Sequence, residues 1–375
     1  MQTHGGVSRC FAELYSHMPA DIKAKISLVE TDNVYLQNLG FKPLGDTFRN
    51  YMGSSSSKLR KMQYKLYYNF KYGKYSRWDK MPMLNAYEQE RLIVEGQYDV
   101  FHPTFFDAYF LPFIGDTPFV VTVHDMIPEI YTQYYSINDP QILQKKNIIP
   151  KAHHLIAVSE QTKNDLVRMM NIPEDKITVV YHGTDETPYE PSKTCPFDFE
   201  YILYVGERHF YKNFNLFCRD CMPILRRHKD LKVVCTGKPF TSEEKYFIET
   251  MGMEKRFIQT FVKTDQEFLD LYNHAVCFVY PSEYEGFGIP ILEAYKADCP
   301  VMLNEASCFP EIAGDAAIFF RMNKERSDFE EQFETLYHLD GNEKEKLLAK
   351  QRERMRMFSW TKSAQQLADV YRRIA

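Results

Sequence analysis

Two glutamates flank a glycine-rich turn in the last third of the chain, and this turn carries the clearest chemistry. Residues 280–294 read YPSEYEGFGIPILEA, with Glu285 and Glu293 eight positions apart. An apolar run before the turn predicts a buried strand, and Pro290 suits the first turn of a helix. The start of such a helix favours a phosphate. Carboxylates beside an anion site indicate hydroxyl groups, so we expect a ligand that joins a diphosphate to sugar and ribose hydroxyls.

Two cations follow another predicted strand at the start of the second half of the chain. Arg208 and Lys212 are one helical turn apart and come after the apolar run 201–205. Arginine can bind phosphate through two parallel hydrogen bonds, and lysine binds it as a point charge. We expect this pair to neutralise a diphosphate. A solvated pair of surface cations is the alternative, and spacing alone does not separate the two.

Histidines end several apolar runs in the first half of the chain. Ligands bind at the carboxyl edge of open α/β sheets, so such residues are candidates for a site. His124 is the first choice, because a neutral imidazole can hydrogen-bond a sugar hydroxyl. A lone histidine is more often structural, and this alternative stays open. His102, His182 and Asp125 are weaker candidates.

The chain opens on a glycine loop. Gly5 and Gly6 precede an amphipathic pattern that predicts a helix over Cys10–His17. These glycines would let the backbone approach donor phosphates. A first parallel strand normally precedes such a loop, so we expect the N-terminal sheet to lack that strand. A frayed tail is the alternative.

Composition bounds the class of protein. The 375 residues favour two domains, and the net charge of −5 argues against a nucleic-acid binder. The eight cysteines are scattered, and the lone pair Cys218 and Cys221 fits ordinary thiols rather than a metal or redox site. No run of about 18 apolar residues occurs, and we expect a cytoplasmic protein without a bound metal.

The segment Lys58–Lys80 interleaves eight cations with aromatic residues. Such a segment could dock on an anionic membrane surface through its cations and interfacial aromatics. The other interpretation is a solvated basic helix whose aromatics face the domain core.

Short apolar runs alternate with helical or loop segments over most of the chain, which predicts parallel βαβ units. A proline-bearing linker over 187–199 separates two such series. The predicted strands are 25–30, 98–102, 119–124, 154–159, 177–182, 201–205, 231–235, 257–261, 276–280, 300–303 and 316–320. Predicted helices include 215–227 and 265–273, a charged helical stretch over 324–357, and a final amphipathic helix over 358–374.

The quoted motifs resemble those of the retaining glycosyltransferases of family 4. The run from Glu285 to Glu293 is similar to their E-x7-E motif, 204–213 to their donor-diphosphate segment, and 5–9 to their N-terminal glycine loop. The stretch HDMIPE that begins at His124 resembles bacterial cell-surface mannosyltransferases. The resemblance implies the GT-B fold, with two Rossmann-like doubly wound parallel-sheet domains that face a cleft. It implies an acceptor-binding domain over 1–190, a nucleotide-sugar-binding domain over 198–357, and a helix over 358–375 that returns to the N-terminal domain.

The resemblance also assigns roles. It implies that Glu285 contacts the donor sugar hydroxyls and Glu293 the ribose hydroxyls. It implies further that side chains and backbone stabilise the diphosphate without a metal or cofactor. The implied catalytic residues are His124, Glu285, Arg208 and Lys212. The implied donor-binding residues are Gly5, Gly6, Arg208, Lys212, Glu285, Gly286, Phe287, Gly288, Ile289 and Glu293.

The expected activity is retaining, metal-independent transfer of a hexose, with mannose favoured, from a nucleotide-diphosphate sugar. GDP-mannose is the favoured donor, and a glycan or lipid-linked acceptor in surface polysaccharide (lipopolysaccharide) synthesis is the expected partner. We expect a cytoplasmic protein, and a peripheral location at the inner face of the membrane if Lys58–Lys80 docks there. A nucleotide-sugar epimerase of the same fold and a non-catalytic nucleotide-sugar-binding protein are the alternatives.

Overall fold

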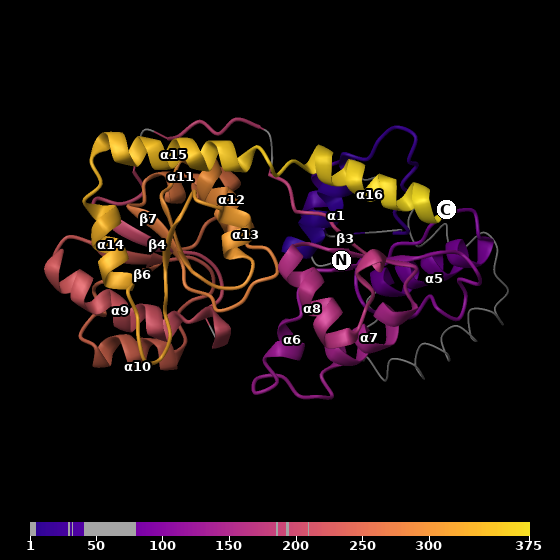
Figure 1. Cartoon of the computed structure of the whole chain (residues 1–375), viewed down its shortest axis with the longest axis horizontal. Helices are drawn as coiled ribbons and strands as arrows, with labels where there is room; N and C mark the ends of the chain where they lie inside the picture. Colours follow the sequence, from indigo (N-terminus) through magenta and orange to yellow (C-terminus); the bar gives the residue numbers. More distant parts are fainter. Residues whose placement is uncertain are drawn as a thin grey trace.

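The computed structural model describes residues 5–28, 31, 33–40, 80–184, 187–192, 195–208 and 210–375. Two parallel sheets organise these residues into two domains that lie side by side (Figure 1). This confirms the predicted two-domain α/β architecture. None of the helices in these ranges has the length and apolar character needed to span a bilayer. The predicted membrane-contact segment Lys58–Lys80 lies outside the described residues, apart from Lys80 itself.

The N-terminal domain is built on a three-stranded parallel sheet in the order β1-β2-β3. The strands are short and rich in β-branched residues, and β1 and β2 are buried throughout, as expected for a sheet covered on both faces. Its strands are β1 (Val120–Val123), β2 (His154–Ala157) and β3 (Ile177–Val179). Its helices are α1 (Gly6–Ser16), α2 (Val34–Asn38), α5 (Lys80–Glu95), α6 (Ile127–Ile130), α7 (Pro140–Ile148) and α8 (Glu160–Met170), with short 3-10 turns η1 (Ile149–Lys151) and η2 (Glu174–Lys176).

Two predicted strands of this domain are wrong. The run 98–102 forms only an isolated bridge between Phe101 and Phe119. Pro103 follows directly and has no N–H to donate, so the ladder does not extend. The other run is 25–30, and its described residues, 25–28, form no strand. Of the described residues, none before Gly6 lies in a strand or helix.

The C-terminal domain has a six-stranded parallel sheet in the order β6-β5-β4-β7-β8-β9. The chain reverses its direction of travel across the sheet between β4 and β7, and ligands bind at the carboxyl ends of strands at such a switch point. The strands are β4 (Tyr201–Tyr204), β5 (Lys232–Cys235), β6 (Phe257–Gln259), β7 (Cys277–Tyr280), β8 (Val301–Asn304) and β9 (Ile318–Phe320). The loops after β4 and β7 hold both predicted cations and the glycine-rich turn.

Helices cover both faces of this sheet. They are η3 (Phe210–Lys212), α9 (Phe214–Arg227), α10 (Ser242–Thr250), α11 (Asp265–Asn273), α12 (Ile289–Lys296), α13 (Phe309–Ala313), α14 (Phe329–Tyr337) and α15 (Gly341–Met355). The helix predicted over 265–273 has the predicted bounds. The helical stretch predicted over 324–357 is instead two helices, because Asp340 and Glu343 form a capping box that begins α15 anew.

The last helix, α16 (Trp360–Ile374), crosses from the C-terminal domain and packs on the N-terminal one, as predicted (Figure 1). Its apolar face shares a core with α1, β1 and β2. The hydroxyl of Ser363 donates to the carbonyl of Tyr181 at 2.6 Å, and a bridge joins Thr184 to Ser359. The helix therefore ties the two domains together. The exact domain boundaries at residues 190, 198 and 358 stay predictions.

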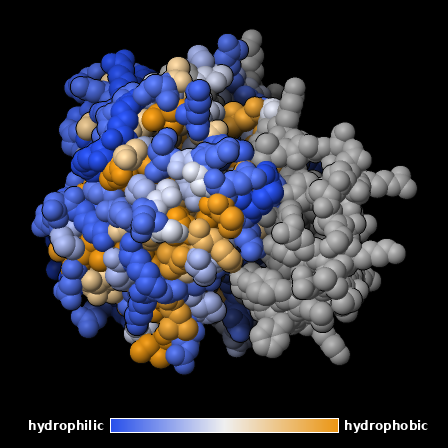
Figure 2. Space-filling view, turned by 90° about the vertical axis from the view of Figure 1, so that its right-hand side faces the viewer, coloured by the Kyte–Doolittle hydropathy of each residue, from blue (hydrophilic) through white to orange (hydrophobic). Residues whose placement is uncertain are grey.

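The end of the molecule formed by the N-terminal domain is largely polar. Figure 2 shows hydrophobic side chains in small patches that hydrophilic ones separate. On the described part of this face, no single large apolar area stands out.

Gly183 has no room for a side chain where the final crossing begins. A Cβ there would lie 2.2 Å from the backbone nitrogen of Trp360 and 2.7 Å from the carbonyl carbon of Ser359. We expect Gly183→Ala to lower the free energy of unfolding by about 1–3 kcal/mol, because backbone must shift to admit the methyl group. Urea denaturation measures this.

Gly341→Ala is the matched control. Gly341 is the first residue of α15, and a Cβ there meets nothing within 4 Å. Its replacement should leave the free energy of unfolding unchanged or raise it by up to about 1 kcal/mol. Equal losses in both variants would contradict the packing account.

Candidate active site between the two domains

The loops after β4 and β7 bring a cation and a carboxylate together. The Lys212 ammonium lies 2.5 Å from a carboxylate oxygen of Glu285, and both side chains are mostly buried. The same ammonium stands 5.2 Å from the ring centre of Tyr211 and 5.8 Å from that of Tyr280. Aromatic faces favour a cation. The structure thus confirms that these two predicted residues are neighbours.

The backbone of Glu285 is fixed by a serine on the neighbouring loop. The Ser307 hydroxyl donates to the Glu285 carbonyl at 2.8 Å, and its oxygen lies 3.3 Å from the Glu285 N–H. Gly288, with φ of 93°, is the N-cap of α12 and turns the chain into the helix. The helix begins at Ile289, one residue before the predicted Pro290. Pro290 has no N–H and the Ile291 N–H donates to the Gly288 carbonyl at 2.9 Å, so the Ile289 N–H is the group that this helix start offers to an anion.

Gly286 presses this loop against the other domain. A Cβ on Gly286 would lie 1.7 Å from the His124 carbonyl oxygen, and the Thr162 hydroxyl stands 3.4 Å from the Gly286 carbonyl. Only glycine fits such an approach. The structure therefore brings His124, just after β1, to the E-x7-E-like turn of the second domain.

The Nε2 atom of His124 is buried and has no hydrogen-bond partner among the described residues, although the residue as a whole is only half-buried. Burial lowers its pKa to about 4, helped by the Lys145 charge and opposed by the Asp125 carboxylate. The imidazole is therefore neutral at pH 7. Lys145, itself buried, holds the loop by donating to the Asp125 carbonyl at 2.8 Å and to Glu129 at 3.0 Å.

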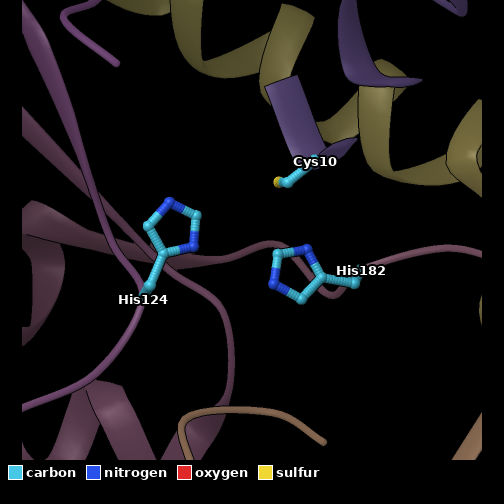
Figure 3. A group of neighbouring side chains, drawn as sticks. All are labelled: Cys10, His124 and His182. Atoms are coloured by element: carbon cyan, nitrogen blue, oxygen red, sulfur yellow. The ribbon is translucent and has the colours of Figure 1, made fainter. Parts of the chain in front are cut away.

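His182, after β3, faces His124. Their rings are nearly parallel, with centroids 5.8 Å apart (Figure 3). Phe287 packs edge-on against His182, with ring centroids 4.8 Å apart. Burial lowers the pKa of His182 to about 3. His102 instead bonds the Tyr371 hydroxyl at 2.6 Å and the Thr122 hydroxyl at 2.9 Å, and these bonds fit a structural role.

Glu293 meets a cation from the opposite domain. The Arg9 guanidinium lies 3.5 Å from its carboxylate, and the Tyr272 hydroxyl donates to it at 3.2 Å. Burial raises the pKa of Glu293, while Arg9 and Tyr272 act in the opposite direction.

The glycine loop at the start of the chain also reaches α12, since a Cβ on Gly6 would lie 3.7 Å from the Ile289 side chain. Gly5, with φ of 147°, is the N-cap of α1. Arg9 is the last residue of the glycine-loop motif, and no local pattern marks its side chain as the partner of Glu293.

Arg208 points elsewhere. Its guanidinium donates to the carbonyls of Thr236, Lys238 and Pro239 and to Glu244. It also lies over the Phe214 and Phe240 rings, at 5.7 and 4.9 Å. All these partners belong to its own domain. In this conformation Arg208 therefore organises the loop after β5 and is not in contact with Lys212, Glu285 or Glu293.

Further contacts between the domains surround the site, and residue types alone did not predict them. The Glu311 carboxylate accepts from the backbone of Glu160 and Gln161, at 2.7 and 3.1 Å, and so caps α8. The Tyr284 hydroxyl donates to Asp165 at 2.6 Å. These partners lie far apart in sequence, and no local pattern links them.

Two family profiles match consecutive parts of the chain. Residues 188–356 match "Glycosyl transferases group 1", and residues 47–187 match "Glycosyltransferase Family 4". Among curated proteins, the chain is 23% identical to the O-antigen chain mannosyltransferase RfbU of Salmonella typhimurium over 309 residues, which cover 82% of this chain and 80% of that protein. It is 25% identical to the O-antigen chain mannosyltransferase B of Escherichia coli over 267 residues, 68% of this chain and 70% of that one.

Solved structures share the fold. Anabaena HepE in complex with UDP and glucose aligns with a TM-score of 0.68 and 15% identity, covering 98% of this chain and 95% of HepE. Sucrose-phosphate synthase from Thermosynechococcus elongatus aligns with a TM-score of 0.62 and 18% identity, covering 78% and 77%. These likenesses agree with the GT-B architecture expected from the motifs. The chain belongs to the family 4 glycosyltransferases, with a group 1 glycosyltransferase domain as its C-terminal half, and is a glycosyltransferase.

Proposed function

We propose that the protein transfers a hexose, with mannose favoured, from a nucleotide-diphosphate sugar to a glycan or lipid-linked acceptor, with retention at the anomeric carbon. One observation carries the proposal: the turn between Glu285 and Glu293 packs directly against His124. This backbone contact brings the loop that carries His124 against the turn that carries Glu285, whose carboxylate pairs with Lys212. The mannosyltransferase names of the two O-antigen relatives favour mannose.

The diphosphate would bind at the start of α12. There Lys212, the Ile289 N–H and the positive end of the helix dipole would offset the phosphate charge without a bound metal. Lys212 now pairs with Glu285, and the incoming phosphate would share this cation while the carboxylate turns to the sugar hydroxyls. Glu293 would hold the ribose hydroxyls beside Tyr272, with Arg9 closing over them from the other domain.

His124 would contact the transferred sugar. Its Nε2 is buried, neutral and without a partner among the described residues, so a sugar hydroxyl would satisfy it. The bond from the anomeric carbon to the diphosphate oxygen breaks, and a bond to the acceptor oxygen forms on the same face of the ring. The acceptor proton passes to the departing diphosphate. This route needs no protein nucleophile.

A panel of nucleotide sugars tests the proposal. We expect GDP-mannose to raise the melting temperature and to release GDP in the presence of a lipid-linked glycan acceptor, and we expect a chelator not to abolish turnover. UDP-glucose is the comparison, since HepE has been solved with it. Nucleotide release without a glycosylated product would favour an epimerase. Thermal protection without any turnover would favour a binding protein.

Lys212→Met should lower kcat for transfer by about 100-fold or more, because one charge that stabilises the leaving diphosphate is lost. A donor assay at saturating GDP-mannose measures this. Lys350→Met is the control, since Lys350 forms an exposed ion pair with Asp315, outside the proposed site. That control should keep both rate and stability. A Lys212→Met rate within about threefold of wild type would remove this residue from the mechanism.

Arg208→Ala should behave differently. It removes three hydrogen bonds to the loop after β5 and one to Glu244 in α10, so we expect it to lower the melting temperature as well as the rate. Differential scanning fluorimetry beside the transfer assay separates the two effects. Loss of rate at an unchanged melting temperature would show that Arg208 turns toward the donor during turnover, as the sequence predicts.

Gly286→Ala should prevent closure of the two domains at the site. The added methyl group would meet the His124 carbonyl, whereas an open arrangement relieves the clash. We expect a loss of transfer of at least about 100-fold, since a misplacement of 1 Å can cost that much. The readout is kcat together with the melting temperature, and Gly341→Ala serves as the glycine control. Full activity in Gly286→Ala would show that transfer does not need this contact.

A further inference from the structure

Three side chains that can bind a metal converge beside the proposed sugar site. Cys10 comes from α1, His124 from the loop after β1, and His182 from the loop after β3. A ligand atom from each lies within 4.8 Å of those of the other two. Figure 3 shows the three side chains facing a common space. In the part of the chain that the structure describes, this is the only such group of three.

We propose that Cys10, His124 and His182 form a binding site for Zn²⁺, and that the ion inhibits transfer by occupying His124. One thiolate and two imidazoles are a ligand set that suits zinc, and three protein ligands leave a fourth position for water. Sequence reasoning did not predict this site, because its ligands come from three separated segments. The inhibition rests on the role proposed above for His124, whereas the binding itself does not.

The spacing of the ligand atoms fits a site that closes on the ion. Zinc–nitrogen and zinc–sulfur bonds of about 2.0–2.3 Å place ligand atoms roughly 3.3–3.6 Å apart in a tetrahedron. Side-chain movements that shorten a 4.8 Å separation by about 1.2–1.5 Å would reach this spacing. His124 has a nitrogen without a partner among the described residues, so zinc costs no hydrogen bond at that atom.

The surroundings favour a soft cation. Phe11 lies edge-on to His124, and Phe287 and Trp360 flank His182, so the walls are largely aromatic. Both imidazoles are neutral when free, as metal ligands must be. Burial raises the pKa of the Cys10 thiol, so the thiol would give its proton to solvent only as it binds the ion. The Glu13 carboxylate acts on Cys10 and the Asp125 carboxylate on His124, and both would offset the charge of a bound ion, whereas the Lys145 cation, which also acts on His124, opposes it.

Co²⁺ is the spectroscopic probe for binding. The metal-free protein, titrated with Co²⁺, should develop a thiolate-to-cobalt charge-transfer band and tetrahedral d–d bands that saturate at one equivalent. Cys10→Ser should abolish the charge-transfer band. Cys195→Ser is the matched control, because Cys195 is the exposed cysteine among the described residues, and it should keep the band. An unchanged band in Cys10→Ser, or its loss in Cys195→Ser alone, would overturn the proposal.

Zn²⁺ tests the consequence. It should displace Co²⁺, raise the melting temperature and inhibit transfer reversibly, with a chelator restoring the rate. Cys10→Ser should keep the basal rate and require at least about 10-fold more Zn²⁺ for half inhibition. Equal sensitivity of this variant and the wild type would refute the inhibitory role. Should Cys10→Ser fail to fold, His182→Gln is read by the same cobalt spectrum, where a retained full band refutes the site. If no donor supports transfer, the cobalt and melting measurements still decide on the metal.

Discussion

The packing of Gly286 on the His124 carbonyl is the constraint on which the rest of the site depends. Each domain alone offers half of the chemistry, a cation and two carboxylates on one side and an imidazole on the other. Gly286 has no side chain, so its backbone can contact the His124 carbonyl and bring the two halves together. The Glu311 cap on α8 and the crossing of α16 hold the same arrangement from either side. Closure of the domains is therefore part of building the site.

Local patterns predicted the elements well where local chemistry decides them. The helix over 265–273 is right because Thr264 caps its first turn and its apolar positions recur at helical spacing. Most strands are right within two residues at each end, because buried parallel strands read as short apolar runs. The strand predicted over 98–102 was wrong because the apolar pattern takes no account of Pro103, which cannot donate to a ladder. The single helical stretch predicted over 324–357 was wrong because Asp340 caps a new helix inside a continuous charged pattern.

The contacts of the site likewise fall into those that the sequence predicts and those that depend on distant parts of the chain. Residues at the ends of neighbouring strands, such as Lys212 and Glu285, can be paired from the sequence, because strand order places their loops together. The partner of Glu293 cannot, because Arg9 reaches it only once two separate domains close. The direction of Arg208 is equally nonlocal. Its guanidinium is held by carbonyls about 30 residues further along the chain and by two phenylalanine rings. Nothing in the residues around Arg208 indicates these partners.

Burial gives His124 two properties at once. A desolvated imidazole stays neutral at pH 7, which lets it accept or donate a hydrogen bond to a sugar hydroxyl without carrying charge into the site. The same neutrality makes it a metal ligand, and a neighbouring thiol and second imidazole complete a set of three. Sugar and metal would therefore compete for one nitrogen. Phe287, which belongs to the turn between Glu285 and Glu293, packs edge-on against His182, so the turn proposed to bind the donor also contacts a proposed metal ligand.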